Sequence, residues 1–513
     1  MNFPRPRHHR TAPPPRQKIV KIDPRAGDYP RSDLNGTLAA LVGVALTAMF
    51  VHSEVPSSLA RWTAIGVLLS LGMSLYADLR LGGLRNLIRA DLMAIFAFYF
   101  LTLFEFLFPQ SHFDELIDVR TTHIAILCVL LAFAGLLTGR HFFHPTKQPF
   151  THTLTREIPP IWIIVIFWAC AFIGYLHMLL AVDWDFTEMV EWWMEPRFSQ
   201  PWQRGRLGDW KALVNELGLF IYLIPPFAGI IIARRKRYHV VNLALVSMAL
   251  LLTFFYGFTS GTRNVVASFL VTFLIAYAFA LPRERQKELV GLCAASAILM
   301  FLATYFMLQF RSVGFRNYVS GDYAPRQSEE RVLFVDYNLY AICRLVEVFP
   351  NKRPYLGWEI PYQALIRPIP RAMWKGKPDG LSYSIEDAMG VQDMTIAASF
   401  AGEAYMAGGL PTVLIIALGF GMLTGWWSHL ASQSNSELGI LIYASGFFAT
   451  VISMRSMFVF TTALLPTVAA LIIGAYAVHI LTTQARILIE RAARKTRGRQ
   501  PPLRRQPPPP RGT

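Results

Sequence analysis

The chain has 513 residues, of which 53% are hydrophobic and only 16% are charged, and its mean hydropathy is +0.36. This composition excludes an ordinary water-soluble domain and predicts a chain that crosses a lipid membrane repeatedly. The formal net charge is +16, but about +13 of it lies in residues 1–34 and 483–513, so it is not presented on a folded domain and does not predict nucleic-acid binding.

Both ends of the chain have the composition of disordered tails. Residues 1–34 contain eight Lys or Arg against three Asp, and residues 483–513 contain nine against one Glu. Proline runs at Pro13–Pro15 and Pro507–Pro510 oppose regular structure there. The first apolar stretch begins only near residue 35 and lacks a small-residue cleavage pattern, so we do not expect a removable signal peptide.

Between the tails, apolar stretches recur that are long enough, at roughly 17–25 residues, to cross a bilayer as helices. Helices are expected because lipid cannot satisfy an open backbone, and the alternating pattern of a β-barrel is absent. The predicted spans are 35–52, 59–76, 92–108, 122–138, 159–182, 212–233, 239–258, 264–281, 289–309, 397–427, 438–453 and 460–482. The predicted fold class is therefore an all-α polytopic membrane protein with about twelve transmembrane helices. The tenth span is long enough to be tilted, broken or partly re-entrant.

Lys and Arg in the short connections predict the orientation, since basic residues concentrate on the cytoplasmic side of a membrane protein. The basic connections fall on the same side as both tails, and their basic residues are Arg80, Arg85, Arg89, Arg140, Lys147, Arg156, Arg234, Arg235, Lys236, Arg237, Arg283, Arg285 and Lys287. We therefore expect both termini in the cytoplasm, with the tails attracted to anionic membrane lipids. Helices 1–9 then occupy 35–310, a large extracytoplasmic loop occupies 311–396, and helices 10–12 occupy 397–482.

Several arginines lie on the extracytoplasmic side, where basic residues are not expected. They are Arg263 in Ser260-Gly-Thr-Arg-Asn264, Arg311 and Arg316 after the ninth span, Arg367 and Arg371 beside Pro368 and Pro370, and Arg455 in Ser453-Met-Arg-Ser-Met457. The arginine fork donates two parallel hydrogen bonds and keeps its charge, so it suits phosphate. Any single arginine could instead snorkel to a lipid headgroup or a helix end. As a set, these arginines predict a diphosphate site.

The loop 311–396 contains the segment Ile366-Arg-Pro-Ile-Pro-Arg371, in which proline favours a rigid, extended backbone. This stiffness would hold Arg367 and Arg371 at low entropic cost, which favours preorganised anion binding. Upstream, Arg331–Val348 has apolar positions at helical spacing and is predicted to lie as an amphipathic helix on the membrane surface.

Carboxylates on the extracytoplasmic side are the other candidates for chemistry. Glu403 opens the tenth span, where an unpaired carboxylate is expensive, so we expect it either to act in catalysis or to pair with an arginine. The segment 183–210 holds a second pool of carboxylates interleaved with tryptophans. These residues are Asp183, Asp185, Glu188, Glu191, Glu195, Trp184, Trp192, Trp193, Trp202 and Trp210. The tryptophans form either an interfacial aromatic belt or a surface that stacks on a glycan, for which Trp192 and Trp193 are the candidates.

Residues 257–460 carry a series of short motifs. Its segments are Val348-Phe-Pro350, Tyr355-Leu-Gly357, Ile369-Pro-Arg-Ala-Met-Trp-Lys-Gly-Lys-Pro378 and Ser399-Phe-Ala-Gly-Glu-Ala-Tyr-Met-Ala-Gly-Gly-Leu-Pro411. This pattern resembles the oligosaccharide repeat-unit polymerases of Wzy type, in which a similar IPR-x-x-W-x-x-KP signature is followed by a Gly-Glu-x-Tyr segment opening the next span. Ser260-Gly-Thr-Arg263 is similar to the G-x-R turn of the same family.

The resemblance implies a GT-C-like bundle that polymerises lipid-linked repeat units at the periplasmic face of the bacterial inner membrane. A growing glycan would move from undecaprenyl diphosphate to the next lipid-linked unit, with a chain-length regulator and a flippase as candidate partners. The residues implied are Glu403 and Arg371 in catalysis, Arg263, Arg311, Arg367, Arg371, Arg455 and Lys377 on the diphosphate, and Trp374, Trp192 and Trp193 on the glycan. Because arginines can neutralise the diphosphate, we expect no cofactor and no metal.

Three other functions stay open. A chain with about twelve spans could be a transporter of an anionic or lipid-linked substrate, although the two halves show no internal repeat. An O-antigen ligase would share the topology and the large loop, but it is expected to use a histidine there, and none occurs between His239 and His429. A metal-dependent glycosyltransferase would want an acidic pair in the first exposed loop, where only Glu54 occurs.

Overall fold

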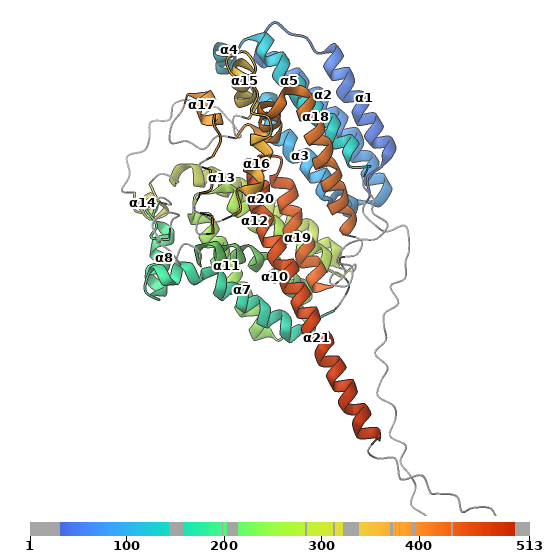
Figure 1. Ribbon diagram of the computed structural model, residues 1–513, viewed down its shortest axis with the longest axis vertical. Coiled ribbons are helices and arrows are strands. Elements are labelled where there is room, and N and C mark those ends of the chain that lie inside the picture. Colours follow the sequence, from blue (N-terminus) through green and yellow to red (C-terminus); the bar gives the residue numbers. More distant parts are fainter. Residues whose placement is uncertain are drawn as a thin grey trace, which may run out of the picture.

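In a computed structural model, the structure describes residues 31–142, 155, 157–196, 199–202, 214–282, 285–310, 313–321, 338–369, 373–374, 376–378, 380–390, 397–431, 434 and 436–497. The regular structure within these ranges is helical throughout, without a strand. The helices gather into one bundle, from which the last helix extends (Figure 1). The prediction of an all-α fold is confirmed for the part of the chain that is described.

The first half of the chain forms the helices α1 (Leu34–Phe50), α2 (Pro56–Gly82), α3 (Ala90–Thr102), α4 (Ser111–Leu116), α5 (Val119–Gly139), α7 (Pro160–Ala181), α8 (Phe186–Met194), α10 (Ile224–Ala233) and α11 (Val240–Thr259). The second half forms α12 (Arg263–Ala280), α13 (Gln286–Phe310), α14 (Phe315–Ser320), α15 (Asn338–Val348), α16 (Glu359–Ile366), α17 (Ile385–Met389), α18 (Ser399–Leu430), α19 (Glu437–Ile452), α20 (Met457–Ala463) and α21 (Leu465–Arg497). Short 3₁₀ turns at Phe104–Leu107 and Leu217–Leu223 extend α3 and precede α10.

Nine helical segments within the described ranges are long and apolar enough to cross a membrane. Three shorter apolar helices, α1, α3 and α19, coincide with the first, third and eleventh predicted spans. Each predicted span therefore overlaps an apolar helix, because a stretch that cannot satisfy its backbone in lipid must form its hydrogen bonds internally. The chain is a membrane protein built from many apolar helices.

Two predictions about the segments flanking the spans are wrong. α21 continues as a helix to Arg497, so the first part of the expected disordered tail after residue 482 is helical, and 498–513 lie outside the described residues. α15, the described part of the expected surface helix, has eight of its eleven residues buried. It packs against α5, α17 and α18. The physical reason is that only Tyr340, Arg344 and Glu347 form a narrow polar side, so the wide apolar remainder of the helix packs against other helices instead of lying on lipid.

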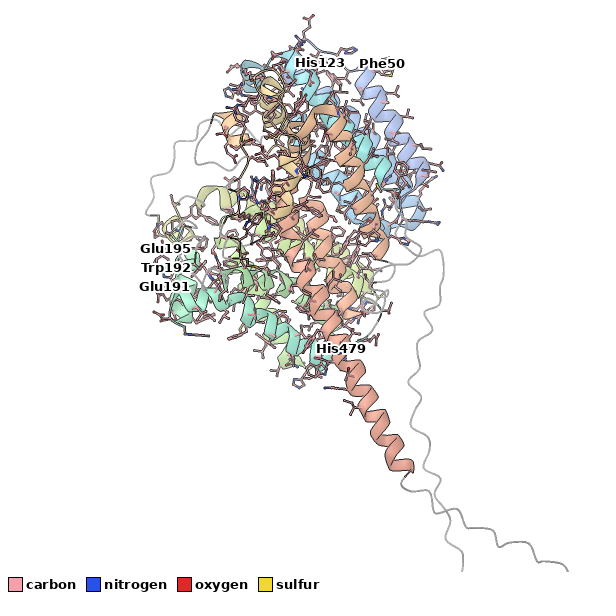
Figure 2. All side chains as sticks on the ribbon, viewed as in Figure 1. Phe50, His123, Glu191, Trp192, Glu195 and His479 are labelled. Carbon is pink, nitrogen blue, oxygen red and sulfur yellow. The ribbon has the colours of Figure 1, made fainter. Side chains whose placement is uncertain are left out.

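The apolar core has two main parts. One joins α1–α5 with α15 and the first two thirds of α18, and the other joins α7, α10, α11, α12, α19 and α21. At one end of the bundle, Phe50 of α1 and His123 of α5 lie close together, whereas His479 of α21 lies toward the other end (Figure 2). His52 and His123 lie with ring centroids 6.4 Å apart at this first end.

α5 and α18 pack closely against each other through small residues. Gly135 lies against Ala417, Gly139 against Gly421, and Gly425 against the backbone of Arg140. The contacts advance in the same direction along both helices, so α5 and this part of α18 are parallel. Glycines spaced by four residues let helix backbones approach closely, as in other membrane helix pairs. Two parallel membrane helices must be separated in the sequence by an odd number of membrane-spanning segments. Five such segments are predicted between α5 and α18.

Gly421→Ala should lower the free energy of unfolding by about 1–3 kcal/mol, in the range expected for overpacking. A Cβ at Gly421 would lie 2.6 Å from the Leu136 carbonyl oxygen, so the two helices would have to separate. Gly419→Ala is the matched control on the same helix, because nothing lies within 4 Å of its added Cβ. Thermal unfolding of the detergent-solubilised variants measures the difference, and equal melting temperatures would contradict the close contact.

α18 is broken by two glycines. Gly408 and Gly409 have φ/ψ of −176°/27° and 72°/−158°, which lie outside the helical region. Phe400 and Phe420 have ring centroids 5.3 Å apart, although a straight helix would separate their backbones by about 30 Å. Residues 399–407 therefore fold back toward the rest of α18, so that the tenth predicted span is broken.

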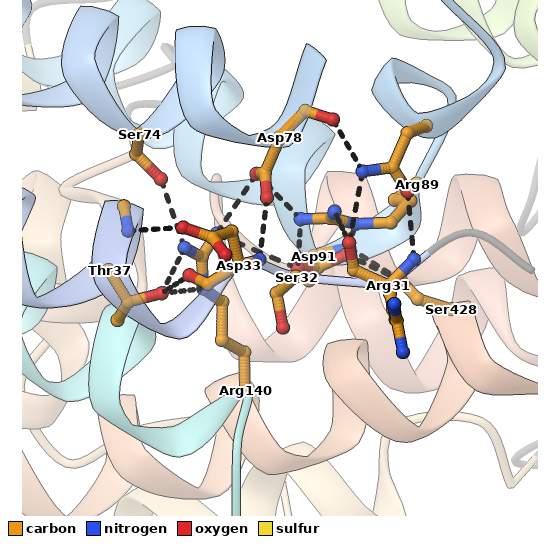
Figure 3. A network of polar contacts seen from close by, with 12 residues as sticks. Arg31, Ser32, Asp33, Thr37, Ser74, Asp78, Arg89, Asp91, Arg140 and Ser428 are labelled. Atoms are coloured by element: carbon orange, nitrogen blue, oxygen red, sulfur yellow. Dashed lines mark hydrogen bonds and ion pairs between the residues drawn. The ribbon is translucent and has the colours of Figure 1, made fainter. Parts of the chain in front are cut away.

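A buried network of charges joins helix ends at the other end of the bundle (Figure 3). Arg89 donates to Asp91 (3.0 Å) and Asp78 (2.9 Å), and Arg140 lies 3.7–3.8 Å from the same two carboxylates. Ser428 near the end of α18 donates to Asp91 (2.7 Å). The start of α3 and the ends of α2, α5 and α18 therefore share one face, as the predicted alternation of spans requires. Arg89 and Arg140 were counted among the basic residues of the short connections, and both are buried in this network.

Candidate functional site

Glu403 lies in the folded-back first segment of α18 and is only 1% exposed. Its two carboxylate oxygens accept hydrogen bonds from the Ser456 hydroxyl and from the Met457 N–H, the latter at 2.6 Å. Ser456 is also the N-cap of α20, where its hydroxyl accepts a hydrogen bond from the Phe458 N–H (3.1 Å). The carboxylate thus joins the broken helix to the turn between α19 and α20.

Two of the predicted arginines lie near this carboxylate. The charges of Arg367 and Arg455 both interact with Glu403. Arg367 follows α16, and its guanidinium lies over the Phe458 ring, 5.5 Å from the centroid. Arg455 lies half-buried in the α19–α20 turn. We call Glu403, Ser456, Arg367 and Arg455 the Glu403 cluster; its members come from three segments that are far apart in the sequence.

The described part of the loop between α13 and α18 docks on the break in α18. The break leaves carbonyl groups without helical partners, and the N–H groups of Leu356 and Gly357 donate to the carbonyls of Met406 (2.9 Å) and Ala407 (3.0 Å). Gly409, at φ 72°, lies so close to Tyr355 that a Cβ there would be 2.7 Å from the Tyr355 hydroxyl. Loop and helix are thereby held together next to the Glu403 cluster.

Lys377 binds the backbone of the loop in this structure. Its ammonium donates to the carbonyl oxygens of Arg367 (3.0 Å) and Ile369 (2.9 Å). These bonds close the segment that follows α16, so Lys377 holds the backbone that carries Arg367. The prediction that Lys377 contacts the diphosphate directly stays a prediction, and the observed bonds give it a positioning role.

Arg263 lies at the same end of the bundle as Arg455. It begins α12, and α12 packs against α19. Near the other end of this pair, Phe279 and Tyr443 have ring centroids 4.9 Å apart. The two helices therefore run antiparallel, which brings the start of α12 and the end of α19 to one face. Arg311 and Arg371, also predicted as site residues, lie outside the described residues.

The carboxylate and tryptophan pool of residues 183–195 forms a separate feature on α8. Glu191, Trp192 and Glu195 lie at the outer edge of the molecule (Figure 2). The Trp192 indole N–H donates to Glu188 (3.2 Å), and Arg316 lies 3.9 Å from Glu195.

Trp193 is buried at 1% exposure, against Tyr175 and Tyr256. Trp193 lies on the side of α8 that faces the bundle, where these contacts cover its ring. This burial contradicts the prediction that Trp193 stacks on a glycan. Trp374, half-buried in the loop, and Trp192 stay as predictions.

Helix capping accounts for the local order on this side of the bundle. Asp118 precedes α5 and accepts hydrogen bonds from the hydroxyl and the N–H of Thr121, the latter at 2.9 Å. These bonds hold the pKa of Asp118 below its usual range.

Among the described residues, His, Cys, Asp and Glu side chains do not gather in threes as a metal site would need.

Sequence reasoning missed the role of Ser456. A serine directly before an apolar helical run is the pattern of an N-cap, so its place at the start of α20 could have been predicted. Its bond to Glu403 could not, because the two residues are 53 positions apart and meet only through the bend in α18.

Comparison with known proteins places the chain in a family. A family model described as a domain of unknown function, DUF8712, matches residues 226–490, slightly more than half of the 513-residue chain. The match runs from α10 into α21 and includes the loop and every described member of the Glu403 cluster. No curated protein and no solved structure matches the chain. The protein therefore belongs to the DUF8712 family.

Proposed function

We propose that this protein is a membrane glycosyltransferase that polymerises lipid-linked oligosaccharide repeat units. A growing glycan would be transferred from undecaprenyl diphosphate to a hydroxyl of the next lipid-linked unit. The observation that supports this most strongly is the position of Arg367 and Arg455 near Glu403, where their charges interact with its carboxylate, beside the loop that resembles the Wzy-type polymerases. Two arginines beside one carboxylate can bind a diphosphate through their guanidinium groups. The carboxylate is then available to take up a proton.

In the proposed reaction, the acceptor hydroxyl oxygen forms a bond to the anomeric carbon of the growing glycan. The bond from that carbon to the diphosphate oxygen breaks, and its electron pair leaves with the lipid diphosphate. Arg367 and Arg455 would stabilise the negative charge that develops on this leaving group.

The hydroxyl proton would pass to Glu403. Its carboxylate already accepts hydrogen bonds from Ser456 and Met457, but a carboxylate has about four lone-pair sites, so further acceptor capacity is left. The two bonds would also orient the carboxylate for this step.

The proposed orientation follows from the basic residues. Arg89 and Arg140 lie at the end of the bundle opposite the Glu403 cluster, and the basic tails are expected on that same side. With that side cytoplasmic, the cluster would face the periplasm, where lipid-linked repeat units are polymerised in the family that this loop resembles. The protein would then lie in the bacterial inner membrane with both termini inside.

One observation also favours a second candidate, a transporter of a lipid-linked anion. Discontinuous helices are a recurring feature of transporter binding sites, and α18 is broken at Gly408 and Gly409. The polymerase is preferred because the loop beside the Glu403 cluster resembles the Wzy-type polymerases, whereas the two halves of the chain show no internal repeat of the kind found in many transporters.

Cells that lack this protein should accumulate single lipid-linked repeat units and lose long polymer. The reason is that units would still be made and exported, but not joined. Gel analysis of the extracted lipid-linked glycans measures the distribution of lengths, with a complemented strain as the control. Retention of long polymer on the lipid carrier would favour the ligase, and accumulation of units on the cytoplasmic side would favour the transporter.

A further inference from the structure

α16 carries an exposed apolar stripe on the side that faces away from the bundle. Trp358, Tyr362 and Leu365 follow one another at helical spacing, and Ile369 continues the same row in the turn after the helix. Trp358 is 75% exposed and Leu365 is 66% exposed. We call these four residues the α16 stripe. Large apolar side chains exposed in one continuous row mark a contact surface.

The rest of α16 is held firmly by the protein. Ile360 and Ala364 are buried on the opposite side, and the helix packs against α18 and α20. Gln363 donates to the Gly380 carbonyl (2.7 Å), and the Ser382 hydroxyl donates to Glu359 (2.7 Å). The stripe is therefore presented by a well-anchored helix rather than by a loose end of the loop.

The chemistry of the stripe suits a lipid surface. Trp and Tyr prefer the boundary between headgroups and hydrocarbon, whereas Leu365 and Ile369 are aliphatic and suit acyl chains better than a sugar face. Arg367, which directly follows α16, offers positive charge beside the stripe for lipid phosphates.

The position of the helix agrees with this chemistry. α20, on which α16 packs, begins the apolar candidate span Met457–Ile480, so α16 lies beside a segment that is apolar enough to enter the membrane.

We propose that α16 is an interfacial membrane helix whose stripe inserts into the lipid leaflet on the side of the Glu403 cluster. The bilayer then sets the depth of α16, and through it the depth of Arg367, which follows the helix directly. Lipid contact does not depend on the proposed function. The consequence that Arg367 meets a lipid-linked diphosphate at headgroup level rests on it.

Spin labels at Tyr362→Cys and Leu365→Cys test this proposal in full-length protein reconstituted into liposomes of phosphatidylethanolamine and phosphatidylglycerol. The exposed native cysteine, Cys293, is replaced by Ala in all variants. Leu251→Cys on α11 is the lipid control, because Leu251 is 68% exposed on a candidate span. Lys352→Cys, in the exposed part of the loop, is the aqueous control. Collisions with oxygen report lipid, and collisions with the charged chromium oxalate report water.

We expect the oxygen-to-chromium collision ratio at 362 and 365 to exceed that at 352 by roughly fivefold or more, because a charged reagent is excluded from hydrocarbon. Adding Leu365→Glu should lower the ratio at 362 toward the value at 352, whereas Leu365→Phe should leave it unchanged. A ratio at 365 like that at 352 would overturn the proposal, since the stripe would then face water. Low collision rates with both reagents would also overturn it, because a protein partner or second copy would cover the stripe.

The experiment measures lipid contact without any turnover. If the stripe is in lipid but cells lacking the protein keep their polymer, the proposed function fails and the interfacial helix stands. If polymer is lost but 365 faces water, only the interfacial helix fails.

Discussion

Replacing Arg367 or Arg455 by alanine should lower polymer formation at least about tenfold. A charge-assisted arginine–phosphate contact contributes on the order of 1.5–3 kcal/mol, and about 1.4 kcal/mol corresponds to one decade in rate. The charges of both guanidinium groups interact with the Glu403 carboxylate, which is the proximity that a shared diphosphate would require. The measurement is the amount and length of lipid-linked polymer in cells that express equal amounts of folded variant. The same loss is expected for Arg263 and for Arg371.

Lysine at either position should restore activity only in part, because an ammonium keeps the charge but loses the two-pronged geometry. Arg120→Ala is the control, since Arg120 is exposed at the start of α5, on the side of the bundle that carries the cluster. The double variant Arg367→Ala with Arg455→Ala should lose less than the sum of the single effects if both bind the same diphosphate. Unchanged polymer in well-folded single variants would show that these arginines anchor the protein at the interface instead, and would direct the search to the carboxylates of α8.

Arg89→Met should lower the free energy of unfolding by about 3–5 kcal/mol. Arg89 is fully buried and donates to Asp78, to Asp91 and to the carbonyl oxygen of Arg31. Removing one partner of a buried charge network leaves the other charges without compensation, which is far costlier than losing an exposed pair. Thermal or denaturant unfolding of the solubilised protein measures the loss. The effect should be larger than that of Gly421→Ala.

Arg80→Met is the matched control for this prediction. Arg80 lies in the last turn of α2, close in sequence to Asp78, but it is exposed and its guanidinium lies 4.9 Å from the Tyr76 ring centroid. Its replacement should change stability by less than about 1 kcal/mol, as for other surface charges. Adding Asp91→Leu to Arg89→Met should recover part of the loss, because it removes an unpaired buried carboxylate. A strictly additive loss in the double variant would contradict a coupled network.

The sequence by itself determined where the helices are and what kind of protein they build. A run of apolar residues long enough to cross a bilayer must satisfy its own backbone, so α5, α7 and α11 could be placed from composition alone. The same reasoning singled out Arg367, Arg455 and Glu403, because such charges stand out on the side that the basic connections predict to be extracytoplasmic. The length of the tenth span also marked it as unusual, since it was long enough to be tilted, broken or partly re-entrant.

Only the tertiary structure decided what covers each helix face and which distant residues meet. Helical periodicity describes one helix at a time and does not show what covers it. The predicted surface helix was therefore assigned to the segment that contains α15, which is buried. The exposed stripe lies on α16 instead. The choice between Trp192 and Trp193 depends on the face of α8 that meets α7 and α11. Arg89 was predicted only as a basic residue of a short connection, because counts of Lys and Arg do not reveal a carboxylate from another helix. Glu403 meets Ser456 only because α18 folds back on itself, and a bend that brings residues 53 positions apart into contact is a property of packing, which no local pattern encodes.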